Sequence, residues 1–126
     1  MKTSGGGLVI RVEGLDELES KLRNIPRKAE SEVEGALIEI LFDLKGKSQR
    51  LAPIDVGNLK GSAFAENDGL EGTVGFQEVY AVIQHESMDF NHPKGGEAKF
   101  LENPFKENIN KYIKAIGAAV KRAVER

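Results

Sequence analysis

The side chains in this sequence that could carry chemistry gather in one short polar stretch. Both histidines of the chain, His85 and His92, lie there together with the carboxylates of Glu86, Asp89 and Glu97. Imidazole and carboxylate groups are ligands for zinc and iron. The sharpest chemical hypothesis is therefore a metal-dependent hydrolase that uses His85, Glu86 and His92.

The spacing of these residues argues against a hydrolase. The pair His85-Glu86 is not followed by a second histidine three residues later, so the helical motif of zinc proteases is absent. His92 lies beside Pro93 and close to the Gly95-Gly96 pair, in a loop that would hold a metal ligand poorly in position. We therefore expect no metal and no cofactor, and keep the hydrolase only as the alternative reading.

Other catalytic patterns are missing as well. The chain has no cysteine, and neither Ser62 nor Ser87 lies in a nucleophile-elbow pattern. The glycines match neither a phosphate-binding loop nor a dinucleotide-binding fingerprint. The six phenylalanines and two tyrosines fall on apolar stripes or in turns, which is typical of a core and not of a base-stacking surface. The sequence predicts a protein that is not an enzyme.

The first half of the chain predicts one strand and two helices that would position this polar stretch. Residues 1–7 are rich in glycine and are expected to be a flexible N-terminus. Residues 8–13 form a strand candidate, and residues 15–24 have the spacing of an amphipathic helix. A long helix is expected over residues 27–51, because Pro26 can open it and Pro53 forces the residue before it out of helical angles.

The middle of the chain changes to the period of a strand. Residues 62–66 and 70–76 alternate between apolar and polar side chains, and Asn67-Asp68-Gly69 lies between them. An Asp-Gly pair is a strong signal for a tight hairpin turn, so we expect an antiparallel hairpin. Residues 79–87 fit a strand or a short helix equally well by their period.

The last part of the chain predicts a polar loop and a helix. The loop runs from Met88 to Lys99 and has few apolar residues to anchor it. Asn103 is expected to cap the last helix, with Pro104 as its first residue. The order of elements predicts an α+β domain over residues 8–126, in which a hairpin or small sheet packs against a long central helix and a C-terminal helix. The expected core contains Leu37, Ile40, Leu41, Leu44, Phe105, Ile109, Ile113 and Ile116.

Charge is distributed unevenly along the chain. The net charge is only −2, but residues 55–97 carry eight acids against two bases, and residues 99–126 carry seven bases against three acids. A DNA-binding protein usually shows a dominant basic stripe, which this sequence lacks. Two readings stay open: the charge runs are solvated faces, or opposite ends attract when identical copies pack head to tail. No apolar run approaches the roughly 20 residues of a membrane span, so we expect no membrane contact.

Two stretches of sequence form an unusual combination. The first, Leu51-Ala52-Pro53-Ile54-Asp55-Val56-Gly57-Asn58-Leu59, stops the long helix and turns the chain towards the hairpin. The second begins with Tyr80-Ala81 after the hairpin and continues, beyond the polar loop, as Phe100-Leu101-Glu102-Asn103-Pro104. The residues that carry the combined motif are Pro53, Asp55, Gly57, Asn58, Leu59, Tyr80, Phe100, Leu101 and Pro104.

This order of motifs resembles a morphogenesis family of tailed bacteriophages, the small neck and tail-completion proteins also described as tail components or minor capsid proteins. The resemblance covers residues 15–126 and implies a short helix at residues 80–86. Many members have Glu-x-Gly-Thr where this chain has Gln84-His85-Glu86-Ser87, which leaves its subfamily open. A non-phage adaptor domain is a further alternative.

The resemblance implies a structural role in the virion of a phage or prophage. Copies of such proteins form an oligomeric ring that completes the tail or serves as a head–tail connector, assembled in the host bacterial cytoplasm. The expected partners are further copies of the chain and the phage connector and tail-tube proteins, with DNA only as the passing genome and no specific binding. The polar loop supplies the candidates for the assembly interface: Asp89, Phe90, Asn91, His92, Pro93, Lys94, Gly95 and Gly96.

Overall fold

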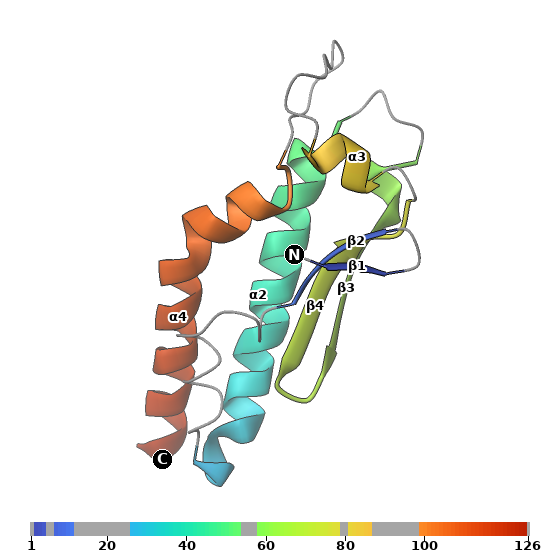
Figure 1. Cartoon of the computed structure of the whole chain (residues 1–126). Helices are drawn as coiled ribbons and strands as arrows, with labels where there is room; N and C mark the ends of the chain where they lie inside the picture. The colour runs from blue at the N-terminus through green and yellow to red at the C-terminus, as the bar shows by residue number, and fades with distance from the viewer. Residues whose placement is uncertain are drawn as a thin grey trace.

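The fold places one long helix between a second long helix and a small sheet (Figure 1). The computed structural model describes residues 2–4, 7–11, 26–53, 58–78, 81–86 and 99–125. Helix α2 (Glu30–Leu51) contacts both α4 (Glu102–Val124) and the hairpin formed by β3 (Ala63–Asp68) and β4 (Glu71–Phe76). The predicted α+β class is confirmed. The amphipathic helix expected at residues 15–24 and residues 88–98 of the polar loop lie outside the described residues.

Prolines flank helix α2 and the short turn before it, as the sequence predicts. Pro26 precedes a short 3-10 turn, η2 (Arg27–Ala29), which leads directly into α2. Glu30 and Glu32 lie in the first turn, where carboxylates interact favourably with the helix dipole. The helix ends at Leu51 because Ala52, the residue before Pro53, adopts an extended conformation with ψ of 143°. The long helix expected over residues 27–51 is confirmed.

The sheet has four antiparallel strands in the order β1-β2-β4-β3. Strand β2 (Gly7–Arg11) pairs with β4 in the middle and ends two residues before the strand expected at residues 8–13. Strand β1 (Lys2–Ser4) pairs with β2, within the segment that the sequence analysis treats as a flexible N-terminus. Its glycine-rich composition gives no alternating apolar pattern, so this first hairpin was not predicted.

The turn between β3 and β4 lies one residue later than predicted. Asp68 pairs with Glu71 in the sheet, so Gly69 and Leu70 are the two turn residues. Gly69 has φ of 60°, whereas Leu70 has no positive φ, and a glycine at the first of the two positions is typical of a type II′ hairpin turn. The prediction of Asn67-Asp68-Gly69 as the turn is wrong in register, because Asn67 and Asp68 still belong to β3.

The hairpin packs on α2 through a very close approach of backbone and side chain. Val74 and Phe76 point from β4 into the core and are fully buried. Gly72, on the same side of β4, lies so close to α2 that a Cβ added there would come within 2.7 Å of a methyl carbon of Leu41. The glycine therefore allows the large Leu41 side chain to fill the space between helix and strand.

Helix α4 begins earlier and buries a different strip than predicted. Leu101 is the residue that precedes the helix, and Pro104 is its third residue, so the prediction of Asn103 as the cap is wrong. The buried side chains of α4 are Pro104, Phe105, Tyr112, Ile116, Ala119 and Ala123. Ile109 and Ile113, expected in the core, are only half-buried beside it. The apolar stripe of α4 is wider than the strip it buries, so its period alone did not show which edge faces α2.

The contact between Leu41 and Gly72 gives a prediction about stability. Gly72→Ala should lower the free energy of unfolding by about 1–3 kcal/mol, because the added methyl group overpacks a filled core. Leu41→Ala should lower it by about 2–5 kcal/mol. The double variant should lose clearly less than the sum of the two, since each change makes room for the other.

Urea denaturation of the three variants measures this coupling. Gly117→Ala is the matched control: Gly117 lies exposed on α4, where an added Cβ meets no neighbour within 4 Å. That change should raise stability by about 0.5–1 kcal/mol through helix propensity. Strict additivity of Gly72→Ala and Leu41→Ala would contradict the observed packing.

Candidate functional site

Only part of the chemical cluster in the sequence falls within the described residues. His85 and Glu86 lie on the short helix α3 (Ala81–Glu86), which confirms the short helix expected near residues 80–86. Asp89, His92 and Glu97 lie outside the described residues, as do all the loop candidates from Asp89 to Gly96. The geometry of the site is therefore that of His85, Glu86 and their neighbours at the start of α4.

His85 joins α3 to the beginning of α4. Its side chain is completely buried, and its Nε2 accepts a hydrogen bond of 3.1 Å from the backbone N–H of Glu102. Glu102 is the first residue of α4, where backbone N–H groups have no partner within the helix. The backbone N–H of Lys99 donates to the carbonyl of His85 at 2.7 Å. His85 thus supplies, from another element, the cap that no side chain of α4 itself provides.

Aromatic contacts connect His85 to the hydrophobic core. The imidazole of His85 meets the ring of Phe100 edge to face, with centroids 5.1 Å apart, and Phe100 meets Phe76 of β4 in the same way at 5.0 Å. Such perpendicular arrangements are favourable for aromatic pairs. The chain of three rings links α3, the start of α4 and the sheet.

Charged groups surround the polar edge of His85. Glu86 forms an ion pair with Lys99, and its carboxylate lies 3.5 Å from Nδ1 of His85. Lys99 also lies 3.8 Å from the carboxylate of Glu102. Lys99 has φ of 56°, a left-handed conformation that costs free energy for a residue with a side chain. The hydrogen bonds of its backbone to His85 and Asn103 hold it there.

The electrostatic surroundings keep His85 neutral. Burial lowers its pKa below the usual 6.5, and the cation of Lys99 acts in the same direction, while Glu86 and Glu102 oppose the shift. Because Nε2 accepts a hydrogen bond, the single proton of the neutral ring lies on Nδ1, next to Glu86. The lone pair that a metal ion would need is therefore already used. Within the described ranges, no group of three or more potential ligands is placed to hold a metal ion.

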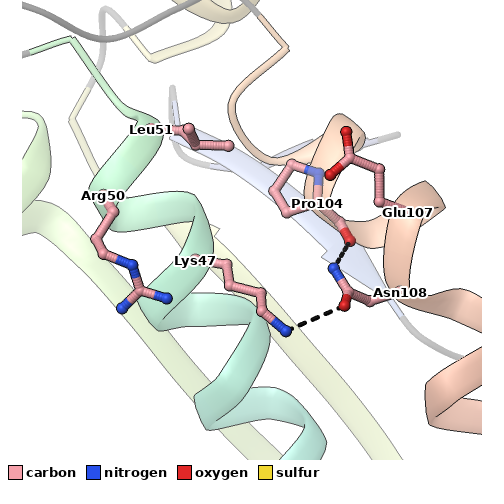
Figure 2. Close-up of a pocket in the computed structure, with 6 residues that line it drawn as sticks. All are labelled: Lys47, Arg50, Leu51, Pro104, Glu107 and Asn108. Atoms are coloured by element: carbon pink, nitrogen blue, oxygen red, sulfur yellow. Dashed lines mark hydrogen bonds between the residues drawn. The ribbon is translucent and has the colours of Figure 1, made fainter.

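A second feature is a pocket between the end of α2 and the beginning of α4 (Figure 2). Its volume is about 480 Å³, and Leu51 and Pro104 provide its apolar surface. Lys47 spans the gap and donates to Asn108 at 3.0 Å, and Asn108 donates to the carbonyl of Pro104 at 2.7 Å. These polar groups satisfy one another, so the pocket wall holds the two helices together.

The same network continues to a buried tyrosine. Asp43 of α2 accepts hydrogen bonds of 2.7 Å from both Lys47 and the hydroxyl of Tyr112 on α4. Burial alone would raise the pKa of Asp43, but the hydrogen bonds from Lys47 and Tyr112 hold it below its usual value. Burial raises the pKa of Tyr112, and the carboxylate of Asp43 raises it further. Asp43, Lys47 and Tyr112 form a polar clamp between α2 and α4.

The motif residues of the sequence serve the core where the structure describes them. Pro53, Leu59, Phe100, Leu101 and Pro104 are all buried, whereas Asn58 is exposed at the start of a turn. Asp55, Gly57 and Tyr80 lie outside the described residues. These motifs therefore fix how the helices meet the hairpin and each other.

Sequence reasoning missed two structural roles. His85 caps α4 from a distance of 17 residues along the chain, a relation that no local pattern reveals. The ammonium of Lys60 donates to the carbonyls of Gln49 and Arg50 at 2.6 and 3.0 Å, and Gln49 returns a hydrogen bond to the carbonyl of Lys60 at 2.8 Å. A lysine at the end of a helix is a known way to satisfy its last carbonyls, and Lys60 does this from the turn before β3.

Comparisons with known proteins returned nothing similar: no family model, no curated protein and no solved structure matches this chain. None of the helices in the described part of the chain is long and apolar enough to cross a membrane.

The buried His85 gives a prediction about pH. Because its pKa is lower in the folded than in the unfolded chain, the unfolded state binds more protons at mildly acidic pH, and stability falls. The stability that depends on a neutral His85 is fully present above about pH 6.5. It is lost as the pH falls through the pKa that His85 has in the folded protein. Protonation of Nε2 also removes the acceptor for the N–H of Glu102.

Thermal unfolding between about pH 7.5 and pH 5 measures this effect on the wild type and on His85→Gln. Glutamine retains an acceptor and does not titrate, so its melting temperature should change less over this range. The loss from protonating Asp43, whose pKa lies below 3.8, should appear only at lower pH. Equal pH dependence of both proteins above pH 5 would contradict the role given to His85.

Proposed function

We propose that this chain is a structural assembly protein of a tailed phage or prophage, and not an enzyme. Copies would form a ring at the head–tail joint that completes the tail or connects it to the head. The observation that carries the proposal is the order of elements: a long helix, a hairpin, a short helix and a C-terminal helix. That order is the one that the resemblance to neck and tail-completion proteins implies.

The places of the motif residues support the proposal. Pro53 and Leu59 lie where α2 passes to the hairpin, and Phe100, Leu101 and Pro104 lie where α4 begins. A motif whose role is to maintain the fold should lie at such junctions, because these positions determine how the elements pack. Among the motif residues that the structure describes, only Asn58 has a polar side chain, and that side chain is exposed.

Polar side chains that could carry chemistry serve instead to hold the elements of the fold together, which suits a structural protein. The lone pair of His85 is used to cap α4, and Lys47 and Asn108 are used to join the helices. At the tip of the hairpin, Glu66, Asp68 and Glu71 are exposed. If this tip faces the channel of a ring, its negative charge repels DNA phosphates and lets the genome pass without being bound. The partners would be further copies, the connector and the tail-tube protein.

A deletion of the gene in the phage or prophage that encodes it tests this proposal. We expect DNA-filled heads and separate tails to accumulate without joining, and the wild-type gene supplied in trans to restore infectious particles. Electron microscopy of lysates shows the two kinds of particle directly. Normal particle yield after deletion would overturn the proposal.

Replacement of residues 89–97 by a short Gly-Ser linker tests the expected assembly interface. The change should leave the melting temperature of the purified protein nearly unchanged and abolish complementation, because the loop would contact a neighbour in the ring. Lys114→Ala, at an exposed position of α4, is the control and should complement normally. Full complementation by the linker variant would exclude the loop as an assembly interface.

A further inference from the structure

The outer face of α2 carries a large aromatic side chain in solvent. Phe42 is 60% exposed, and Ile38, one turn earlier, is only partly buried. Because successive residues of a helix are rotated by about 100°, Phe42 lies on the side of α2 opposite Val33, Leu37 and Leu44, which are in the core. Neither Phe42 nor Ile38 belongs to the hydrophobic core that α2 forms with the sheet and α4.

The surface of α2 around Phe42 has few projecting side chains. Gly35 and Gly46 lie on the same side of α2, and a Cβ at Gly35 would meet no neighbour within 4 Å. A Cβ at Gly46 would meet only the guanidinium of Arg50, at 3.5 Å. Two glycines inside a helix cost about 0.5–1 kcal/mol each relative to alanine. Their absence of side chains allows another helix to approach closely on both sides of Phe42.

Charges are separated along this outer face. Glu39 precedes Phe42, as does Glu34 at the edge of the face, where the amide of Asn67 on β3 donates to its carboxylate at 3.4 Å; Lys45 and Arg50 follow Phe42. The ammonium of Lys45 lies 5.8 Å from the centre of the Phe42 ring. One half of the face is therefore acidic and the other half basic, with the aromatic ring between them. Two such faces attract each other when they run antiparallel and repel each other when they run parallel.

We propose that this outer face of α2, formed by Glu34, Ile38, Glu39, Phe42, Lys45, Gly46 and Arg50, pairs with the same face of a second copy. The two α2 helices run antiparallel about a twofold axis near Phe42. The two Phe42 rings then meet at the axis, and Ile38 of each copy lies against Gly46 of the other. The acidic half of each helix then lies against the basic half of the other.

The geometry sets the strength and symmetry of the pair. Contact through one helix face per copy is small compared with stable dimer interfaces, so the dimer should be reversible and depend on protein concentration. Its charged rim should make it weaker at high salt. The contact is isologous and closes after two copies, whereas a ring needs contact between two different surfaces. The pair is therefore a property of the free protein and does not depend on the proposed role in the virion.

Charge reversal in the full chain tests the pairing. The variant Glu34→Lys/Glu39→Lys makes the face entirely basic, and Lys45→Glu/Arg50→Glu makes it entirely acidic. We expect each variant alone to be monomeric in sedimentation equilibrium at concentrations where the wild type is dimeric. An equimolar mixture of the two should form a heterodimer, because unlike charges then meet along the whole face. A monomeric wild type, or a mixture that remains monomeric, would overturn the proposal.

A neutral substitution separates pairing from folding. Phe42→Asn should weaken the wild-type dimer by about tenfold or more, as expected for an aromatic side chain at the centre of an interface, with little change in melting temperature. Val124→Asn is the matched control, since Val124 on α4 is the other large apolar side chain exposed among the described residues, at 40%. It should leave the dimer unchanged. If Val124→Asn disrupts the dimer and Phe42→Asn does not, the interface lies on α4 and the proposal is wrong.

Discussion

Helix α2 is packed on two sides, against the sheet and against α4, and the positions of the other elements depend on this packing. On one side, Leu41 fills the space that Gly72 leaves open in β4. Towards α4, Asp43 and Lys47 hold Tyr112 and Asn108 by hydrogen bonds. The sheet and α4 thus both take their positions from the same helix, which lies between them in Figure 1. The face of α2 that points away from both the sheet and α4 carries the exposed Phe42.

The polar residues that first suggest chemistry serve this architecture. His85 is neutral and buried, and its lone pair replaces the missing cap of α4. Its ring contacts Phe100, which contacts Phe76, so the same residue connects a short helix, a long helix and the sheet. Lys60 ties the end of α2 to the turn before β3 in a comparable way. Polar groups that hold the elements together in this way suit the proposed role as a structural protein that must keep its fold when it assembles.

Much of the fold follows from local sequence, and most of the site does not. Pro26 and Pro53 determine the ends of the first long helix through backbone geometry alone, and the alternation on both sides of Gly69 predicts the hairpin. The strip that α4 buries could not be predicted, because Ile109 and Ile113 are as apolar as Ile116 and only the position of α2 distinguishes them. The pairing of β1 with β2 could not be predicted, because the glycine-rich sequence there has no alternating apolar pattern. The role of His85 depends on a contact with Glu102, which is distant in sequence, and on burial that no spacing reveals.

The central claim, that this protein is part of the head–tail joint, is tested most directly by cryo-electron microscopy of purified particles from the phage or prophage that encodes it. The account predicts a ring of density between head and tail into which α2, α4 and the hairpin of each copy fit as packed here. Mass spectrometry of the same particles should detect the protein as a stoichiometric component. Absence of the protein from complete, infectious particles would contradict the account.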